Sequence, residues 1–336
     1  MERKEKHGGL RSFGDLKYLN EKGFLHQKWD NRVYPPFYNK AAINELQKFW
    51  HTDENDIFIT THQKVGTHLT KRFVSEILRR CYPYKADNGI FSGDIGHHTI
   101  PWPEVLVSQY GLDAFKTFLE KTAGMPRVWY LHCSGQDLPF KKLHKDSRFI
   151  FVFRDPRGTC ESQFHFYKSH PMLGVDESIT MEDFVDIFLD GKLYFGDYYK
   201  HTLHWINGCE GKIDPRQLLI MRYENLVEEK LPSAQLLNNF IYPHKILSIN
   251  DLNNVVSSTD FNKMKKEISE NPQSFHFNPK TFFRAGKTYG WQEKLSKEII
   301  EKINIKTEKV WGKGNLSSPQ IKNKLTLKSN LYGINS

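Results

Sequence analysis

The sequence predicts an α/β protein with a single domain, in which a central parallel β-sheet carries helices on both faces. Short apolar runs of strand length alternate along the chain with longer amphipathic stretches of helix length. There is no internal repeat and no clear linker, and 336 residues with 38% hydrophobic and 14% aromatic side chains suffice for one large core. We assign residues 35–312 to the domain, residues 1–34 to an N-terminal arm and residues 313–336 to a polar C-terminal tail.

Four short runs have the composition of buried parallel strands. Asp56–Thr61 is apolar and β-branched, and Arg127–Leu131, Arg148–Phe153 and Leu218–Arg222 are similarly apolar runs of strand length. Each strand is followed by a polar segment. Because ligands of such sheets bind at the carboxyl ends of the strands, we expect these polar segments to meet at one edge.

Helices are expected between and beyond these strands. After Gly66, apolar side chains recur at intervals of three and four residues up to position 78, and Pro156 is suited to the first turn of a helix. Residues 1–55 are otherwise expected to be irregular, and residues 81–104 and 271–290 to be loops. Further helices are predicted at Ala41–Trp50, Asp113–Thr122, Pro156–Tyr167, Met181–Asp190, Lys192–Ile206, Leu231–Phe240, Asp260–Ser269 and Trp291–Val310.

The junction of the first strand and its helix is the best candidate for a binding site. A strand, a tight loop and a helix direct free backbone N–H groups and the helix dipole at an anion, and Lys64 adds a cation there. We therefore predict a P-loop-like phosphate-binding loop at residues 62–68, although an ordinary turn with a solvated lysine is an alternative. Lys64 precedes Gly66, whereas the Walker A lysine follows its glycine, so an ATP or GTP enzyme of that type is disfavoured.

Composition and charge indicate which kinds of ligand and which cellular compartment to expect. The chain has 48 Lys and Arg against 39 Asp and Glu, a net charge of +9, which favours an anionic ligand or simply a solvated basic surface. It shows no spacing typical of nucleic-acid-binding modules, so no nucleic-acid partner is expected. The N-terminus is polar and no run approaches about 18 apolar residues, so we expect a cytoplasmic protein without a membrane partner. Scattered cysteines without metal-like spacing indicate free thiols and no metal site: Cys81, Cys133, Cys160 and Cys209.

Seven segments in order resemble the cytosolic sulfotransferases, and the resemblance spans roughly residues 35–310. THQKVGTHL (61–69) is similar to TYPKSGTTW of that family, and PRVWYLH (126–132) is similar to PRxxKTH. RDPRGTCESQFHFY (154–167) keeps Arg and Ser eight positions apart, as in the family. The remaining similar segments are IPWPE (100–104), RYEN (222–225), STDFNKMKK (258–266) and RAGKTYGW (284–291).

The resemblance implies transfer of a sulfuryl group from 3′-phosphoadenosine 5′-phosphosulfate (PAPS), which leaves 3′-phosphoadenosine 5′-phosphate (PAP), without a metal. His132 is then the general base, for which an imidazole is suited near neutral pH, and Lys64 and Ser162 are the other catalytic residues. The donor-binding residues implied by the resemblance are Lys64, Val65, Gly66, Thr67, His68 and Leu69 at the 5′-phosphosulfate; Arg154, Ser162, Arg284, Ala285 and Gly286 at the 3′-phosphate; and Tyr223, Thr259 and Phe261 at the adenine.

The chain also departs from the family at identifiable positions. Leu69 stands in place of an adenine-stacking Trp, Ala285 in place of a Lys, and Tyr130 in place of the Lys two residues before the histidine. The family's dimerisation motif, which follows the final Trp, is poorly kept. We therefore expect a monomer or a weak dimer.

The acceptor side differs most from the family. After His132 the chain is polar (CSGQDLP), where the family is usually apolar, and flat phenols or steroids need a mainly apolar pocket. We expect a small polar or cationic natural product bearing a hydroxyl or an amine-type nitrogen, such as a saxitoxin-like alkaloid. The alternatives are a sulfotransferase of phenols or alcohols and, outside the family, a nucleotide-dependent phosphoryl transferase or a non-enzymatic nucleic-acid binder. The candidate acceptor-binding residues are Asp94, His97, Trp102, Glu104, Asp137 and His170.

Overall fold

The computed structural model describes residues 26–29, 32–82, 100–170, 173, 175, 178–270 and 286–312. At its centre is a four-stranded sheet of β3 (Asp56–Thr61), β4 (Arg127–Leu131), β5 (Arg148–Phe153) and β6 (Leu218–Arg222). The strands are all parallel and lie in the order β4-β3-β5-β6. The predicted fold class and the bounds of the four predicted strands are confirmed.

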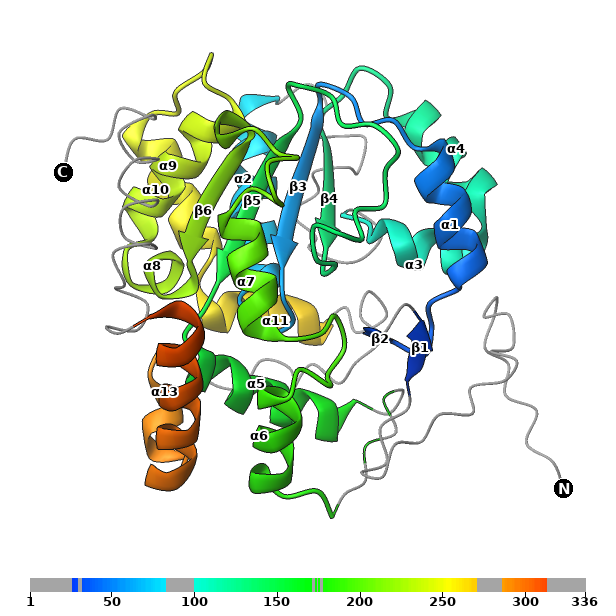
Figure 1. The fold of residues 1–336 in the computed structure, drawn as a ribbon. Coiled ribbons are helices and arrows are strands. Elements are labelled where there is room, and N and C mark those ends of the chain that lie inside the picture. Colours follow the sequence, from blue (N-terminus) through cyan, green and yellow to red (C-terminus); the bar gives the residue numbers. More distant parts are fainter. Residues whose placement is uncertain are drawn as a thin grey trace, which may run out of the picture.

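Helices cover both faces of this sheet, as predicted for a parallel α/β domain. Figure 1 shows α7 (Tyr198–Ile206) in front of the sheet and α2 (Thr67–Cys81) behind it, with the arrowheads of the strands pointing towards α5, α6 and α13. The other predicted helices that are confirmed are α1 (Lys40–Phe49), α4 (Leu112–Lys121), α5 (Pro156–Ser169), α6 (Met181–Leu189), α9 (Lys230–Ile241), α11 (Phe261–Glu270) and α13 (Lys297–Trp311).

Two predicted helices begin later than expected. The helix predicted from Lys192 begins only at Tyr198, because Phe195 and Gly196 have positive φ values of 68° and 83° and Asp197 then caps the first turn. The helix predicted from Trp291 begins at Lys297. A 3-10 turn, η5 (Gly290–Glu293), precedes it, and the Ser296 side chain accepts a hydrogen bond from the Ile299 N–H.

Several elements were not predicted. They include the hairpin of β1 (Gln27–Trp29) and β2 (Arg32–Tyr34), so the expectation of an irregular chain was wrong there. The Trp29 and Tyr34 rings stack with their centroids 3.9 Å apart, which holds the hairpin together. The other unpredicted elements are α3 (Pro103–Tyr110), η3 (Pro215–Gln217), α8 (Tyr223–Glu228) and α10 (Ile249–Ser258).

A buried ion pair fixes β3 against β4 at their amino ends. The Asp56 carboxylate accepts hydrogen bonds from Arg127 Nε at 2.7 Å and Trp129 Nε1 at 2.8 Å. Burial nevertheless raises the pKa of Asp56 above its ordinary value. The pair sets the register that brings Thr60 opposite Leu131, so that residues 62 and 132 leave the sheet at the same edge.

The described cysteines are free, as the sequence predicted, and each of them is buried. Within the described residues, every helix is too short or too polar to span a lipid bilayer.

Candidate active site

The loop between β3 and α2 turns through two residues in the left-handed region. Lys64 has φ of 66° and Gly66 has φ of 112°. A Cβ atom on Gly66 would also lie 2.6 Å from Cδ2 of Tyr223, so glycine is required both for conformation and for space. Gly66 caps α2, whose first backbone N–H groups lack acceptors within the helix. The loop therefore presents a cation and a positive helix terminus, the features of an anion site.

His132 follows β4 directly and has a defined tautomer. Its Nδ1 lies 2.9 Å from the Thr61 carbonyl oxygen, which can only accept a hydrogen bond, so Nδ1 carries the proton. Nε2 consequently keeps its lone pair. Burial lowers the pKa of His132 to about 3, and the positive charges of Lys71 and Lys64 act in the same direction. The imidazole is therefore neutral at pH 7 and is able to accept a proton through Nε2.

Arg154 follows β5 and connects the loop to the C-terminal part of the chain. Its Nη1 donates to the Lys64 carbonyl at 3.3 Å and its Nη2 to the Lys287 carbonyl at 3.4 Å. Its guanidinium carbon lies 4.4 Å from the centroid of the Tyr223 ring. Arg154 Nε is buried and has no hydrogen-bond partner within the described residues. A buried donor of this kind is costly to leave unsatisfied unless a ligand completes it.

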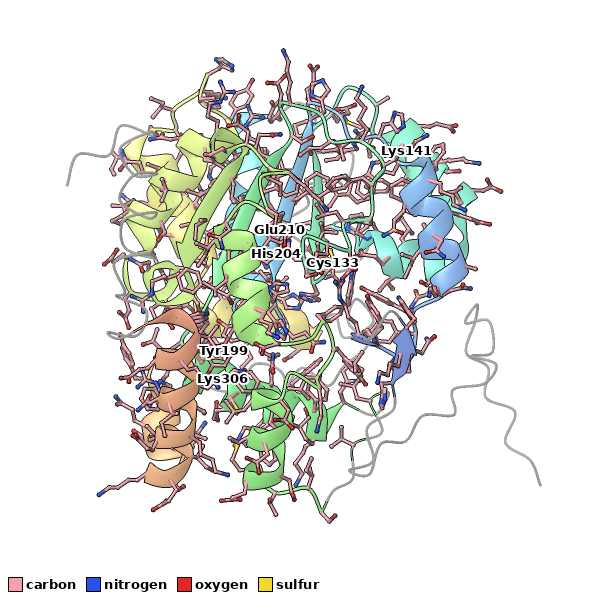
Figure 2. The ribbon with its side chains drawn as sticks, in the orientation of Figure 1. Cys133, Lys141, Tyr199, His204, Glu210 and Lys306 are labelled. Atoms are coloured by element: carbon pink, nitrogen blue, oxygen red, sulfur yellow. The ribbon has the colours of Figure 1, made fainter. Side chains whose placement is uncertain are left out.

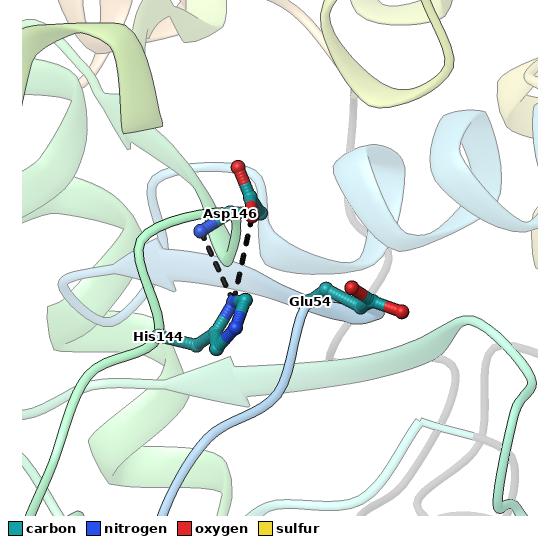
Figure 3. Close-up of side chains that lie close together, drawn as sticks. All are labelled: Glu54, His144 and Asp146. Carbon is teal, nitrogen blue, oxygen red and sulfur yellow. Dashed lines mark hydrogen bonds and ion pairs between the residues drawn. The ribbon is translucent and has the colours of Figure 1, made fainter.

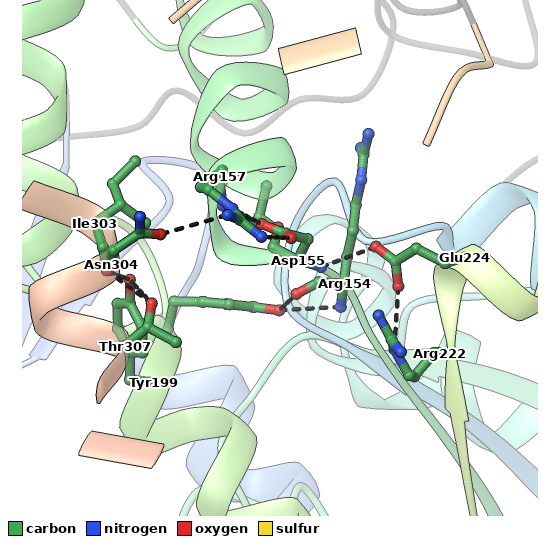
Figure 4. Close-up of polar contacts among 11 residues, drawn as sticks. Arg154, Asp155, Arg157, Tyr199, Arg222, Glu224, Ile303, Asn304 and Thr307 are labelled. Atoms are coloured by element: carbon green, nitrogen blue, oxygen red, sulfur yellow. Dashed lines mark hydrogen bonds and ion pairs between the residues drawn. The ribbon is translucent and has the colours of Figure 1, made fainter. Parts of the chain in front are cut away.

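The neighbouring Asp155 does not hold Arg154. Figure 4 shows Asp155 paired with Arg157 instead, whose Nε lies 2.9 Å from Asp155 Oδ1. The Asp155 N–H donates to Glu224 at 3.0 Å, which connects α5 to α8. Arg157, and not Arg154, therefore forms the structural ion pair with Asp155. The Arg154 side chain extends separately from this network.

The segment that begins at Gly286 lies close to the start of α11. Gly286 has φ of 61°, and a Cβ there would lie 2.5 Å from Cδ2 of Phe261. Backbone and ring therefore meet in close contact at this position. Arg284 and Ala285 lie outside the described residues, so their predicted contacts stay predictions.

One cavity of about 410 Å³ joins these segments. Val65 is fully buried in the core and is absent from the described lining. The predicted site residues that line the cavity are Lys64, Gly66, Thr67, His68, Leu69, Trp102, His132, Arg154, Ser162, His170, Tyr223, Thr259, Phe261 and Gly286.

The structure also adds residues that the sequence analysis did not name. Lys230 lines the cavity and donates to the Thr259 carbonyl at 3.1 Å, and Lys294 lines it beside Glu161 at 3.1 Å. Nothing in their local sequence separates these lysines from the many solvated ones. Trp291 lies in the segment RAGKTYGW and could have been named from it.

The acceptor side differs from the expected polar wall. Glu104 and Asp137 are absent from the described lining. Glu104 is buried in the first turn of α3, where burial raises its pKa to about 8 and keeps it uncharged at neutral pH. Asp137 is ion-paired with Arg32 of the hairpin and accepts from Ser134 at 3.2 Å. Asp94 and His97 lie outside the described residues.

Side chains that do line this end of the cavity are mainly aromatic or aliphatic. Polar exceptions include His170, Gln109 and Lys64. The apolar members are Phe37, Trp102, Val105, Leu106, Tyr110, Phe118, Tyr130, Phe166 and Leu173.

A separate cluster of metal-type side chains lies at the surface. Figure 3 shows Glu54, His144 and Asp146, whose ligand atoms lie within 4.8 Å of one another. His144 Nδ1 accepts from the Asp146 N–H at 3.2 Å and lies 3.8 Å from its carboxylate. Both carboxylates are exposed, and none of the three lines the cavity. These contacts are those of an ordinary surface turn.

Comparisons with known proteins agree with this arrangement. A family model described as "Sulfotransferase domain" matches residues 54–314. The chain therefore belongs to the sulfotransferase family, and the protein is a sulfotransferase enzyme. Its sequence is 23% identical over 295 residues to flavonol 3-sulfotransferase of Flaveria bidentis, covering 84% of this chain and 91% of that protein.

Two further similar proteins come from mouse. Sulfotransferase 1 family member D1 of Mus musculus is 26% identical, over 85% of this chain and 96% of its own length. A crystal structure of a mouse sulfotransferase complexed with PAP superposes with a TM-score of 0.67 at 18% identity, covering 90% of this chain and 98% of that one. This structural likeness supports the fold.

Proposed function

We propose that the protein transfers a sulfuryl group from PAPS to a hydroxyl group of a small-molecule acceptor, with His132 as the general base. The observation that carries this proposal is the shared cavity. It places an anion-type loop, the buried guanidinium of Arg154 and an imidazole with an available Nε2 lone pair around one space. These are the groups that an in-line transfer from an anionic donor requires.

The described residues fit a nucleotide with phosphate groups at both ends. Lys64 and the first amides of α2 would hold the 5′-phosphosulfate, and Arg154 with Ser162 would hold the 3′-phosphate. The unsatisfied Arg154 Nε would gain an acceptor from that phosphate. Tyr223 and Phe261 line the same cavity and would pack against the adenine. The similar mouse sulfotransferase was crystallised with PAP.

The reaction follows from these positions. PAPS supplies a sulfuryl group on a phosphate leaving group, and the acceptor oxygen forms a new bond to sulfur while the bond from sulfur to the bridging oxygen breaks. The acceptor proton passes to His132 Nε2, and the electron pair of the broken bond stays with the phosphate. Lys64 and the loop amides would stabilise the charge that grows on that phosphate.

The described lining favours a flat, hydroxylated aromatic acceptor over a cationic one. Trp102, Tyr130 and Phe166 contribute aromatic rings to the lining, and Lys64 Nζ lies 4.9 Å from the centroid of the Phe166 ring. An ammonium at this place repels a cationic acceptor and attracts an ionising phenol. One relative is named for sulfation of a flavonol, which belongs to the same chemical class. The earlier expectation of a saxitoxin-like acceptor is therefore the alternative to be tested.

An acceptor screen with ³⁵S-labelled PAPS tests this proposal. We expect label to appear on phenols and flavonols in the presence of EDTA, because none of the groups described above requires a metal. Sugars and guanidinium alkaloids should receive at least about tenfold less label, since unsatisfied hydroxyl groups and an unpaired charge are both costly to bury in an apolar wall. Labelling of the alkaloids alone would contradict the acceptor class. Failure to label any acceptor, combined with Mg²⁺-dependent transfer from ATP, would contradict the function itself.

A further inference from the structure

Lys71 is a fully buried lysine of α2 that the reaction described above does not use. Its relative exposure is 0%, whereas lysine side chains in folded proteins almost always reach solvent. Its Nζ donates to the Ile100 carbonyl at 3.4 Å and lies 3.6 Å from the centroid of the Tyr130 ring. Because burial of an ammonium group is costly, a fully buried lysine is a candidate for a specific role in the site.

The contacts of Lys71 join the two segments that form the aromatic wall beside His132. Ile100 leads into Trp102, and the Tyr130 N–H donates to the Pro101 carbonyl at 3.2 Å. The Trp102 ring lies 5.2 Å from the Tyr130 ring and 4.8 Å, edge-on, from the His132 ring. Lys71 thus fixes the backbone before Trp102 and the ring of Tyr130 simultaneously.

The position of this cation is also relevant to the family resemblance. The motif PRxxKTH has a lysine where this chain has Tyr130. Here an ammonium group reaches the face of that tyrosine from α2 instead of from β4. A positive charge is thereby present at this wall although the strand itself no longer supplies it.

We propose that Lys71 is a positioning residue of sulfuryl transfer, an internal cation that holds the wall of Trp102 and Tyr130 and keeps the His132 imidazole unprotonated when the anionic donor is bound. This inference rests on the proposed function. An anion in the cavity favours protonation of a neighbouring imidazole, and a protonated His132 is unable to take the acceptor proton. A fixed cation over the ring of Tyr130 opposes that effect, because its charge is screened little in the protein interior.

Other groups around His132 share in its titration. Burial is the largest cause of the lowered pKa of His132. Among the charged side chains that lower this pKa further, Lys71 has the largest effect. The described titratable or charged groups that face or adjoin the imidazole are Lys64 from the loop, Lys71 from α2, His62 after β3, Tyr130 from β4 and His201 from α7.

Lys71→Gln provides the test, because glutamine still offers an N–H to the Ile100 carbonyl while removing the charge. The His132 titration is followed by NMR on ¹³C-histidine-labelled protein saturated with PAP, and its signal is assigned by its loss in His132→Asn. We expect the titration midpoint to rise by about one pH unit in Lys71→Gln. The acid limb of the pH profile for turnover should move by the same amount. Lys71→Arg, which retains the charge, should keep the wild-type midpoint.

A matched control exists in a second lysine over a tyrosine. Figure 2 labels Lys306 of α13 and Tyr199 of α7, where Lys306 Nζ lies 5.8 Å from the ring centroid, outside the cavity lining. Lys306→Gln should leave the His132 midpoint unchanged. Equal midpoints in the wild type and Lys71→Gln, with PAP bound by both, would overturn the inference. If Lys71→Gln does not fold, a changed midpoint in Lys71→Arg overturns it instead. Absence of sulfuryl transfer in the wild type would overturn the proposed function separately.

Discussion

His132→Ala is expected to lower kcat by about 10²–10⁴-fold, the usual contribution of a general base, while PAP binding is retained. The acceptor hydroxyl is a poor nucleophile until its proton is removed. In this structure, the Nδ1 bond to the Thr61 carbonyl leaves Nε2 as the proton acceptor. His132 makes no described contact with Arg154 and should therefore affect turnover much more than donor affinity. Initial rates with ³⁵S-labelled PAPS, together with the thermal shift produced by PAP, measure both quantities.

His144→Ala is the matched control for this change. His144 is a partly exposed histidine of the surface cluster in Figure 3, outside the cavity lining, and its loss should leave kcat and the PAP shift unchanged. If His132→Ala retained more than about a tenth of the wild-type kcat, the assignment of the general base would be wrong.

Arg154→Ala is expected to weaken PAP binding by about 10–100-fold, which corresponds to the loss of one hydrogen-bonded charge pair of about 1.5–3 kcal/mol. Arg154 is the buried cation between the loop carbonyl of Lys64 and the carbonyl of Lys287, with Nε still available to a phosphate. At 100 times its Kd, a ligand stabilises the folded protein by about 2.7 kcal/mol, so the thermal shift caused by PAP reports this change directly. KM for PAPS should rise much more than kcat falls.

Two further variants separate charge from geometry at this position. Arg154→Lys keeps a positive charge but loses the planar fork, so we expect intermediate binding. Arg216→Ala removes an arginine whose side chain is 82% exposed and should leave the PAP shift intact. An unchanged PAP shift in Arg154→Ala would show that the 3′-phosphate is held elsewhere.

The sheet could be predicted from the sequence because its strands are short, apolar and continuous. All four predicted strands, such as Asp56–Thr61 with six buried residues, have the bounds that the structure gives them. Boundaries that depend on a few unusual backbone angles could not be predicted. Phe195 adopts a left-handed conformation although it is not glycine, and the local sequence pattern does not predict a turn there before α7. The pairing of β1 with β2 includes stacking of the Trp29 and Tyr34 rings, which periodicity alone does not reveal.

The two sides of the cavity differed in how well they could be predicted. His132 and Arg154 follow strands directly, so their positions follow from the order of the parallel sheet. The acceptor side depends on contacts between distant segments. Asp137 forms an ion pair with Arg32, and Glu104 is buried in α3. Neither carboxyl group lines the described cavity. The polar segment that follows His132 in the sequence therefore does not form a polar acceptor-side wall within the described residues.

A crystal structure of the protein with PAP tests the central claim most directly. The account predicts the 5′-phosphate against Lys64 and the first turn of α2, the 3′-phosphate within hydrogen-bond distance of Arg154 and Ser162, and the adenine between Tyr223 and Phe261. His132 Nε2 should then face the space where the sulfuryl group of PAPS would lie. PAP bound outside this cavity, or bound within it with its 5′-phosphate remote from His132, would contradict the account.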